Sequence, residues 1–427
     1  MGAFWKLLYR TVVIPALWLF LQAAALTSPK VRRGIRGRRN LFPLLERRMA
    51  ALPPGKRVWF HASSMGEFEQ AKPIIAELKR RHPQVRVITT FFSPSGYENS
   101  RRYTLNDAVS YLPFDTAANA RRFLRTVAPD AAVMVRYDIW PNHVWELRAQ
   151  GVPTLIANAT MSRQSERKVP LVRSFHTHVY NAIDAILTVS SSDAEAFRDF
   201  RLDRPVVEAI GDTRFDQVSQ RSAEARKRHI IAERITAGRK VLVAGSTWPD
   251  DEEVLLPAFV ELQHAFPDAL LVLVPHEPTV EHLEDVEAEL AGKTSSIRFS
   301  ALNDYSGERV IVVDSIGVLL SLYACAHAAY VGGSFRQGVH NTLEAAVYGI
   351  PVLFGPKHRN SQEPLQLVGA GGAFVVNDSR DLFRALENLF RDEAARVAAG
   401  RRAAQFVQAN TGATERFLRH LERCLER

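Results

Sequence analysis

The sequence predicts an α/β protein with two Rossmann-like domains, each a parallel sheet flanked by helices, preceded by an apolar N-terminal segment. The chain has 427 residues, which is several times the ~150 residues of a typical domain. Short β-branched runs alternate with helical stretches in two successive series, the pattern of parallel α/β sheets. Residues 11–29 carry no formal charge, so this segment is treated apart from the two domains.

Composition limits the function classes. Hydrophobic residues make up 46% and charged residues 24% of the chain, which excludes a wholly disordered, collagenous or polytopic membrane protein. Two cysteines, Cys325 and Cys424, provide neither a disulfide framework nor the spacing of a zinc site. The net charge of +9 favours an acidic partner such as a phosphate, a nucleic acid or an anionic membrane surface. The arginine pairs are scattered and lack interleaved aromatics, which argues against nucleic acid.

The N-terminal segment has three interpretations. Residues 11–29 just reach the ~17–25 residues that cross a bilayer, so an uncleaved anchor or an embedded monotopic helix is expected. A cleaved signal peptide is the second interpretation, because residues 23–25 are all alanine. A helix packed on the protein's own body is the third. Six positive charges in residues 30–39 favour the anchor, with the following chain on the cytoplasmic side and against anionic headgroups.

The two domains follow from two series of predicted strands. The first series is expected at residues 57–61, 85–89, 131–135, 153–157 and 185–189, with a helix at 67–80. A basic helical segment at 220–238 separates it from a second series at 240–244, 270–274, 310–313, 328–331 and 351–354. Residues 379–427 are expected to be helical. The predicted organisation is an anchor at 1–29, a first domain at 30–218 and a second domain at 219–427. Neither domain has a GxGxxG fingerprint, which argues against a dinucleotide redox cofactor.

Ligands of open parallel sheets bind at the carboxyl ends of the strands, and the first domain has three polar turns there. Gly66 permits a tight turn before Glu67, whose carboxylate either accepts a proton from a bound hydroxyl or complements the dipole of its helix. Asp138 is either a second site carboxylate or the cap of the following segment. Arg214 either neutralises a leaving phosphate or pairs with a nearby acid.

The second domain has two such turns. The acids at 250–253 invite a metal site, but Thr247 with Asp250 is instead predicted to cap a helix. Gly332 and Gly333 follow a strand, and a helix is expected to begin near Asn341 with free N–H groups for a phosphate. Glu344 is placed to accept hydrogen bonds from a ribose diol, or else to act as the capping partner of Asn341.

Taken together, these strings resemble the 3-deoxy-D-manno-octulosonic acid (Kdo) transferases, membrane-associated GT-B enzymes of lipopolysaccharide synthesis. The resemblance spans essentially the whole chain and starts with the apolar segment and its basic flank. The matching strings are His-Ala-Ser-Ser-Met-Gly-Glu at 61–67, Leu-Pro-Phe-Asp at 112–115, Ile-Trp-Pro-Asn at 139–142, Gly-Ser-Thr at 245–247 with the glutamates at 252–253, Val-Pro-His at 274–276, Gly-Gly-Ser at 332–334, His-Asn at 340–341 with Leu-Glu at 343–344, and Gly-Pro at 355–356.

The resemblance implies a role for particular residues. Glu67 would be the catalytic base, and Asp138 and Arg214 would assist the transition state. The residues implied in binding the cytidine nucleotide are Pro275, His276, Gly317, Val318 and Leu319, with Asn341, Thr342, Leu343 and Glu344 at its phosphate and ribose. The implied reaction transfers Kdo from CMP-Kdo to the tetra-acylated lipid A precursor at the cytoplasmic face of the inner membrane and releases CMP. No metal and no cofactor other than the donor is implied, and no nucleic-acid partner.

This chain departs from the family pattern at several positions. Asp138 stands where the family usually has Glu, and Arg214 where it usually has Lys. Val339 and Thr342 replace the usual Gly and Pro, and Thr160 replaces an Arg. These departures affect what can be inferred about acceptor binding and about the groups that stabilise charge. They do not affect the inferred donor pocket.

Two alternatives of different classes were weighed. Another GT-B enzyme, such as a lipid A disaccharide synthase-like protein or a nucleotide-sugar epimerase, would share the domains, but the strings at 64–67 and 139–142 argue against it. A non-enzymatic, membrane-anchored anion-binding protein would keep the basic surface and would not need Glu67. Removal of residues 1–28 is expected to release much of the protein from membranes, and high salt the part that the basic cluster still holds. Because none of the implied catalytic groups lies in residues 1–28, turnover is expected to persist.

Overall fold

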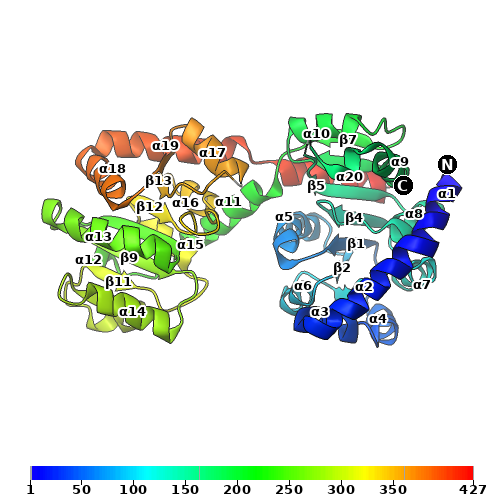
Figure 1. Ribbon diagram of the computed structural model, residues 1–427, viewed down its shortest axis with the longest axis horizontal. Coiled ribbons are helices and arrows are strands. Elements are labelled where there is room, and N and C mark those ends of the chain that lie inside the picture. Colours follow the sequence, from blue (N-terminus) through cyan, green and yellow to red (C-terminus); the bar gives the residue numbers. More distant parts are fainter. Residues whose placement is uncertain (1, 163, 360, 427) are drawn as a thin grey trace. The chain divides into compact units, whose positions relative to one another are not determined.

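The computed structural model describes residues 2–162, 164–359 and 361–426. They divide into two compact units, Met1–Gln217 with Thr411–Arg427, and Val218–Asn410. Each unit contains a seven-stranded sheet (Figure 1). The predicted α/β class with two parallel sheets is therefore confirmed.

The sheet of unit 1 is parallel throughout, in the order β3-β2-β1-β4-β5-β6-β7. Its strands are β1 (Arg57–Ala62), β2 (Arg86–Phe91), β3 (Ala108–Tyr111), β4 (Ala131–Val135), β5 (Thr154–Ala159), β6 (Ala185–Thr188) and β7 (Val206–Ala209). The five predicted strands are all present within a few residues. The two strands that were not predicted, β3 and β7, are the short edge strands of the sheet.

Helices cover both faces of this sheet, as parallel sheets require. Val58 and Phe60 of β1 point to the face covered by α5 (Met65–Arg81) and α20 (Ala413–Leu425), whereas Trp59 points to the opposite face. That opposite face is covered by α4 (Leu41–Ala50), α7 (Ala117–Val127), α8 (Pro141–Ala149) and α9 (Pro170–Tyr180). The other helices of unit 1 are α3 (Pro29–Gly37), α6 (Pro94–Ser100) and α10 (Ser191–Arg198), and α11 (Thr213–Ala225) crosses the boundary between the units.

The last helix departs from the expected domain division. Three helices account for most of residues 379–425 as predicted, but the last of them, α20, belongs to unit 1 and not to the second domain. Phe417 and Leu421 are buried in the core beneath α5. Asp216 also accepts hydrogen bonds from the backbone N–H groups at the start of this helix, including Thr414 at 2.7 Å. The sequence did not predict that α20 packs in unit 1, because its partner helix α5 lies more than 300 positions earlier in the chain.

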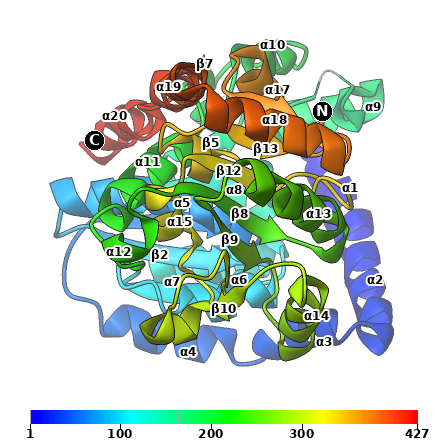
Figure 2. The same cartoon turned by 90° about the vertical axis from the view of Figure 1, so that its left-hand side faces the viewer.

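The sheet of unit 2 is also parallel, in the order β10-β11-β9-β8-β12-β13-β14. Its strands are β8 (Lys240–Thr247), β9 (Ala269–Pro275), β10 (Ser296–Arg298), β11 (Val310–Val312), β12 (Ala328–Val331), β13 (Val352–Phe354) and β14 (Ala373–Val375). Its helices are α12 (Glu233–Thr236), α13 (Pro249–Ala265), α14 (Val280–Leu290), α15 (Leu319–Leu322), α16 (Leu343–Ala346), α17 (Gln362–Gly369), α18 (Ser379–Arg391) and α19 (Glu393–Ala409). Figure 2 shows α13 beside α18, where both contribute to one core cluster. Unit 2 therefore repeats the layered architecture of unit 1.

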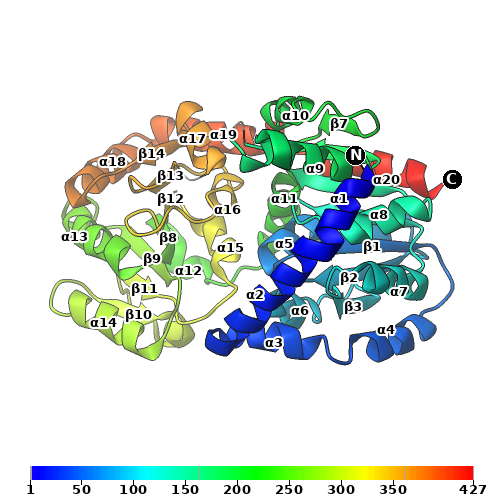
Figure 3. The ribbon, with the colours of Figure 1, turned by 45° about the vertical axis from the view of Figure 1, so that its right-hand side comes forward.

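The N-terminal segment forms a helix that lies along unit 1 (Figure 3). It comprises α1 (Gly2–Leu8), a π-helical turn at Tyr9–Val13 and α2 (Ile14–Thr27). Trp5, Tyr9 and Ile14 are buried against unit 1, and the Tyr9 hydroxyl donates to Oδ2 of Asp115 at 2.8 Å. This helix is long and apolar enough to cross a membrane. Core helices of other proteins and signal sequences meet the same criterion of length and composition.

The opposite face of this helix is exposed. Its large apolar side chains include Leu19 and Phe20, which are 61% and 67% exposed. The N-terminal helix is thus part of unit 1, with one face in the core and the other turned outward. Its buried face agrees with the third interpretation of the sequence, and its exposed apolar face is weak evidence for membrane association.

Candidate functional site

The turn after β1 places Glu67 in the first turn of α5. Ser64 is the N-cap, and Glu67 at the third helical position completes a capping box. Oε2 of Glu67 accepts from the backbone N–H groups of Ser63 at 2.5 Å and Ser64 at 3.3 Å. Gly66 does not make a tight turn as expected, because it lies within α5 with open space where a Cβ would be. The capping role of Glu67 is therefore present, and it fixes the carboxylate for any further role.

Glu67 is buried, and its surroundings favour the protonated form. Burial raises the pKa of its carboxyl above the ordinary 4.5, and the negative charge of Asp138 raises it further. The hydrogen bonds from Ser63 and Ser64 act in the opposite direction but do not outweigh the burial. A carboxylate with a raised pKa is better suited to take a proton near neutral pH than an ordinary surface glutamate.

Asp138 lies just after β4 and is held by His61 at the end of β1. Nε2 of His61 lies 2.8 Å from Oδ2 of Asp138, and the Trp140 indole N–H donates to the same oxygen at 3.3 Å. Burial alone would raise the pKa of Asp138, but the hydrogen bond and the charge of His61 lower it below its ordinary 3.8. The two carboxyl groups therefore have pKa values displaced in opposite directions, an arrangement that separates a proton acceptor from a permanently charged group.

A chain of hydrogen bonds orients His61. The Trp59 indole N–H donates to Oγ1 of Thr90 at 2.7 Å, and this hydroxyl lies 2.9 Å from Nδ1 of His61. Nδ1 also lies 3.1 Å from the carbonyl oxygen of Thr90, so both ring nitrogens of His61 have fixed partners. The sequence analysis did not assign a role to His61. The signal available was its place at the end of β1, six residues before Glu67.

Arg214 is paired with a neighbouring acid. Its Nε donates to Oδ2 of Asp212 at 2.8 Å, and Asp212 is buried. The next residue of the turn, Thr213, donates from Oγ1 to the carbonyl of Gln70 at 2.7 Å and accepts from the Asn158 amide at 2.6 Å. Because Gln70 follows Glu67 by three residues on α5, this buried network fixes the start of α11 beside the helix that carries Glu67.

In unit 2, three aromatic rings meet where β8 and β9 end. His276 stacks on His340 with ring centroids 4.4 Å apart and an interplanar angle of 10°. The Trp248 indole N–H donates to Nε2 of His340 at 2.9 Å. Burial lowers the pKa of His340, and the neighbouring His276 lowers it further. Pro275, which closes β9, is buried, whereas His276 is exposed and available to a ligand.

Asp251, rather than Asp250, is the acid that organises the glycine turn. It accepts from the backbone N–H of Trp248 at 3.0 Å and from that of Gly333 at 2.7 Å. The expected Thr247–Asp250 capping pair is therefore wrong, since Trp248 is the N-cap of α13. Gly333 has a φ of +92°, and a Cβ there would lie 2.5 Å from the carbonyl oxygen of Gly338, so the turn requires glycine.

The segment from Asn341 to Glu344 is only partly as expected. The helix begins at Leu343 and α16 has four residues, so it lacks the macrodipole that was expected to attract a phosphate. The Asn341 side chain is exposed, and its Oδ1 accepts from the backbone N–H of Leu343 at 3.2 Å. Thr342 and Leu343 are buried, so they can offer only backbone groups to a ligand. A carboxylate oxygen of Glu344 lies 3.6 Å from the Arg221 guanidinium.

Gly317, Val318 and Leu319 lie at the start of α15, near the same strand ends. Gly317 has a φ of +81°, a conformation that favours glycine. A Cβ on Gly245 of β8 would lie 2.7 Å from the Leu319 side chain and 2.4 Å from the Tyr323 hydroxyl. Burial and the charge of Glu344 raise the pKa of Tyr323. Through these contacts the predicted nucleotide-binding residues of unit 2 gather around the ends of β8, β9 and β12.

No set of metal ligands accompanies these groups. Within residues 2–162, 164–359 and 361–426, no three His, Cys, Asp or Glu side chains are grouped so as to hold a metal ion. Asp251 and Glu252, which lie in the acidic run, are instead bonded to Trp248, Gly333 and His282. The charged groups of the site are thus protein side chains with protein partners.

The fold is shared with solved structures of an epimerase and of MurG. The UDP-GlcNAc 2-epimerase of Neisseria meningitidis superposes with a TM-score of 0.59 at 14% identity, over 86% of this chain and 100% of that one. The MurG protein of Acinetobacter baumannii gives 0.52 at 15% identity, over 87% and 100% of the two chains. With its two parallel sheets, the protein has the fold of the GT-B class.

Sequence similarity identifies the family within this class. Residues 36–217 match the family model described as 3-deoxy-D-manno-octulosonic-acid transferase (kdotransferase). The 3-deoxy-D-manno-octulosonic acid transferase of Aquifex aeolicus is 30% identical over 78% of this chain and 85% of its own length. That of Haemophilus influenzae is 27% identical over 99% of both chains. The chain belongs to the Kdo transferase family and is a glycosyltransferase.

Proposed function

We propose that this Kdo transferase takes Kdo from CMP-Kdo and attaches it to the tetra-acylated lipid A precursor. The observation that carries the proposal is the carboxyl pair of unit 1, in which burial raises the pKa of Glu67 and His61 lowers that of Asp138. A sugar hydroxyl is a weak nucleophile, and a base that takes its proton makes the attack feasible. The pair therefore suits transfer to an alcohol acceptor.

The reaction balances with one proton transfer. Glu67 accepts the proton of an acceptor hydroxyl, whose oxygen forms a bond to the anomeric carbon of Kdo. The bond from that carbon to the phosphate oxygen breaks, and CMP departs with the electron pair. Asp138 stays charged beside Glu67 and favours protonation of the base as the attack proceeds.

We also propose that protein groups stabilise the departing phosphate, with no metal ion and no cofactor besides the donor. Arg214 provides a guanidinium held in place by Asp212. In unit 2, the backbone around Asn341 and the exposed His276 would bind the phosphate, and Glu344 the ribose. Fixed donors of this kind stabilise developing charge without reorganisation.

The location we propose is the cytoplasmic face of the inner membrane. The exposed apolar face of α1 and α2 supports membrane attachment. The basic residues at 30–39 follow directly, and positive charge is typical of the cytoplasmic side. The inner face of this helix is bonded to unit 1. We therefore propose that the helix lies along the membrane–water interface.

The direct test is transfer by the purified protein. CMP-Kdo and the tetra-acylated lipid A precursor are incubated with the enzyme in detergent, and the products are read by mass spectrometry. A product heavier than the acceptor by one or more Kdo units, together with free CMP, supports the proposal. Intact substrates after incubation with folded enzyme contradict it.

A further inference from the structure

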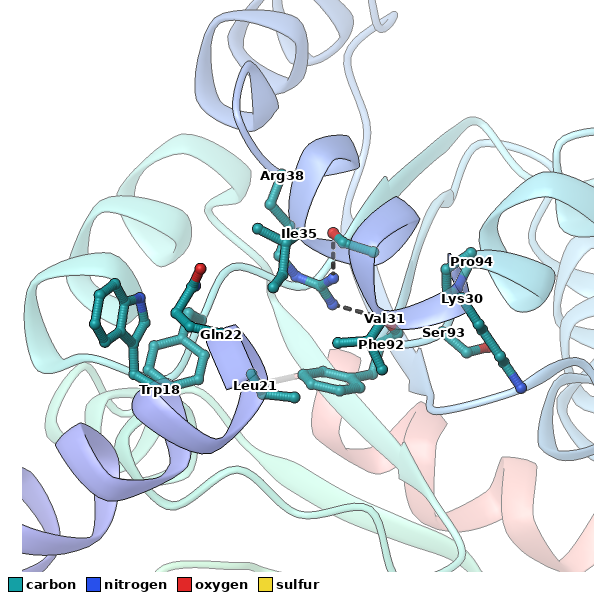
Figure 4. A pocket seen from close by; sticks show the side chains of 12 residues that line it. Trp18, Leu21, Gln22, Lys30, Val31, Ile35, Arg38, Phe92, Ser93 and Pro94 are labelled. Carbon is teal, nitrogen blue, oxygen red and sulfur yellow. Dashed lines mark hydrogen bonds between the residues drawn. The ribbon is translucent and has the colours of Figure 1, made fainter. Parts of the chain in front are cut away.

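An apolar pocket lies between the N-terminal helix and the body of unit 1. It is formed by α2, α3 and the turn after β2, and its volume is about 290 Å³. This is close to the lower end of the ~300–1,000 Å³ of small-ligand sites. Figure 4 shows Leu21 of α2, Val31 and Ile35 of α3, and Phe92 after β2 around this space. The walls are thus mainly aliphatic and aromatic, and one of them is α2 of the N-terminal segment.

A cation without an acidic partner lies in the same wall. The Arg38 guanidinium donates to the carbonyl oxygens of Gly34, Phe92 and Leu112, each at 2.8 Å. Figure 4 shows the Arg38 side chain bonded at the Phe92 wall of the pocket. Among the described residues no carboxylate lies within 4.0 Å of it, and burial lowers its pKa to about 10. Lys30 lines the pocket as well. The guanidinium also lies 4.6 Å from the centroid of the Phe92 ring, so carbonyl oxygens and an aromatic ring stabilise it where no carboxylate does. A pocket with apolar walls and a net positive charge suits an anionic amphiphile.

Two contacts connect the pocket to the carboxyl pair. Phe92 stacks on Trp140 with ring centroids 4.7 Å apart, and the Trp140 indole N–H donates to Asp138. Ser93, which also lines the pocket, donates its N–H to the carbonyl of Ser63 at 2.9 Å. The N–H of Ser63 in turn donates to Glu67. The pocket and the catalytic carboxyl groups therefore share a wall within one unit.

We propose that this pocket binds one acyl chain of the lipid acceptor, so that the N-terminal helix forms part of the acceptor site. The inference rests on the proposed function and adds the position of one acyl chain of the acceptor. An anionic acylated sugar seated here would place its apolar part against α2 and its polar part toward Glu67. Continuity with the carboxyl groups is what favours the acceptor over a bulk phospholipid.

The binding free energy of this pocket differs from that of an ordinary hydrophobic site. An acyl chain in a bilayer or micelle is already out of water, so entering the pocket exchanges one apolar environment for another. The pocket then acts by selecting and orienting the acceptor, and its loss should raise KM more than it lowers kcat.

The first experiment fills the pocket from the N-terminal helix. L21W places an indole in the pocket, and L19W makes the same change two residues away on the exposed face. With the tetra-acylated acceptor, L21W should raise KM about tenfold, the scale of a disturbed apolar subsite, while kcat changes little. L19W should keep the wild-type KM. V31W fills the pocket from α3 and should reproduce the effect if L21W folds poorly. Equal KM values for wild type, L21W and V31W would overturn the proposal.

The second experiment identifies the occupant. An acceptor carrying a diazirine in one acyl chain is photolysed with the enzyme in detergent, and labelled peptides are mapped by mass spectrometry. Label in α2, α3 or residues 92–94, displaced by unlabelled acceptor, supports the proposal. Label from a diazirine phospholipid that the acceptor does not displace would assign the pocket to bulk lipid and overturn it. Failure of the proposed function is distinguishable, because wild-type enzyme would then transfer no Kdo whether or not the pocket is labelled.

Discussion

His61 contacts Asp138 through Nε2 and Oδ2 at 2.8 Å, and this contact separates the two carboxyl groups of unit 1 into different roles. The charge of Asp138 is stabilised by His61 and Trp140, so its pKa falls. The backbone donors of Ser63 and Ser64 and the charge of His61 only partly offset the burial of Glu67 and the charge of Asp138, so the pKa of Glu67 rises. The same local environment thus yields one stable anion and one proton acceptor.

Replacing Glu67 by Gln should abolish most turnover without unfolding the protein. Gln keeps an oxygen for the N–H groups of Ser63 and Ser64, so the helix cap survives, but it cannot take a proton. The loss should be ~10²–10⁴-fold in kcat, the usual contribution of general-base catalysis. E77Q, a surface change on the same helix, is the matched control and should stay near wild type. Near-normal activity in E67Q would show that Glu67 serves only as a cap.

The same variant should change how stability depends on pH. The pKa of Glu67 is raised in the folded state, so the fold binds this proton more tightly than the unfolded chain does. The stabilisation that comes from this bound proton is complete below about pH 4.5, the ordinary pKa of the group. It is lost as the pH rises through the pKa of the folded state. E67Q removes this loss, so at neutral pH it should be at least as stable as wild type. Chemical denaturation at several pH values measures the difference. A clear destabilisation of E67Q at neutral pH would contradict the assigned direction.

The pH profile tests the coupling between the two carboxyl groups. In the wild type, kcat/KM should fall as pH decreases through the raised pKa of Glu67, because the base becomes protonated. In D138N the neighbouring negative charge is absent, so the pKa of Glu67 should fall and the acid limb should move to lower pH. The acid limb of the kcat/KM profile is measured on the activity that D138N retains. If the limb lies at the same pH in D138N and in the wild type, a group other than Glu67 determines it.

Glu344 can be tested separately from its partner Arg221. If Glu344 binds the ribose, E344A should weaken CMP binding at least tenfold, since each hydrogen bond to a charged group contributes ~1.5–3 kcal/mol. R221A removes the cation 3.6 Å away and leaves the carboxylate in place, so it should change CMP affinity far less. Calorimetry with CMP compares the two. Unchanged affinity in E344A would leave Glu344 a purely structural partner of Arg221.

Much of the fold could be predicted because its signals are local. The central strands of both sheets are continuous apolar runs, buried on both faces, and ten of them were predicted. The missed strands β3, β7, β10 and β14 are short, and their status depends on pairing with a neighbour. The position of Glu67 in the first helical turn was likewise local, since a strand and a capping pattern surround it.

The rest depends on contacts that sequence spacing does not reveal. Asp138 was identified, but its partner His61 lies 77 positions earlier. The docking of the N-terminal helix depends on a bond between Tyr9 and Asp115, 106 positions apart. The helix predicted to begin near Asn341 begins at Leu343 and has four residues, because its extent depends on packing as well as on capping residues. These are tertiary properties, and only the packed chain shows them.

Metal dependence is the next prediction. Because the charged groups of the site have protein partners, transfer should continue in excess chelator at close to the untreated rate. The assay uses the wild-type enzyme with CMP-Kdo and acceptor, with and without chelator. Complete loss that Mg²⁺ restores would mean that the acidic run at the start of α13 had been misinterpreted.

The N-terminal helix has an inner face that is part of the core of unit 1. Tyr9 packs against Trp145 and Phe175, with ring centroids 5.7 Å away in each case. Its hydroxyl donates to the fully buried Asp115. Removing a donor from a buried carboxylate costs ~1.5–3 kcal/mol, so Y9F should lower the free energy of unfolding by about that amount. T11V is the control, because the Thr11 hydroxyl bonds only to Leu7 of its own helix and is exposed.

Removing residues 1–28 should have a larger effect of the same kind. The truncation uncovers Trp145 and Phe175 and leaves Asp115 without the Tyr9 donor. We therefore expect the truncated enzyme to unfold at lower temperature and denaturant concentration than the full chain in the same detergent, an effect that the expectation from sequence did not include. Turnover per folded molecule should persist, with a raised KM for the acylated acceptor. If the truncated and full-length chains unfold at the same denaturant concentration, the helix is an independent anchor, and it would then be free to cross the bilayer instead of lying along unit 1.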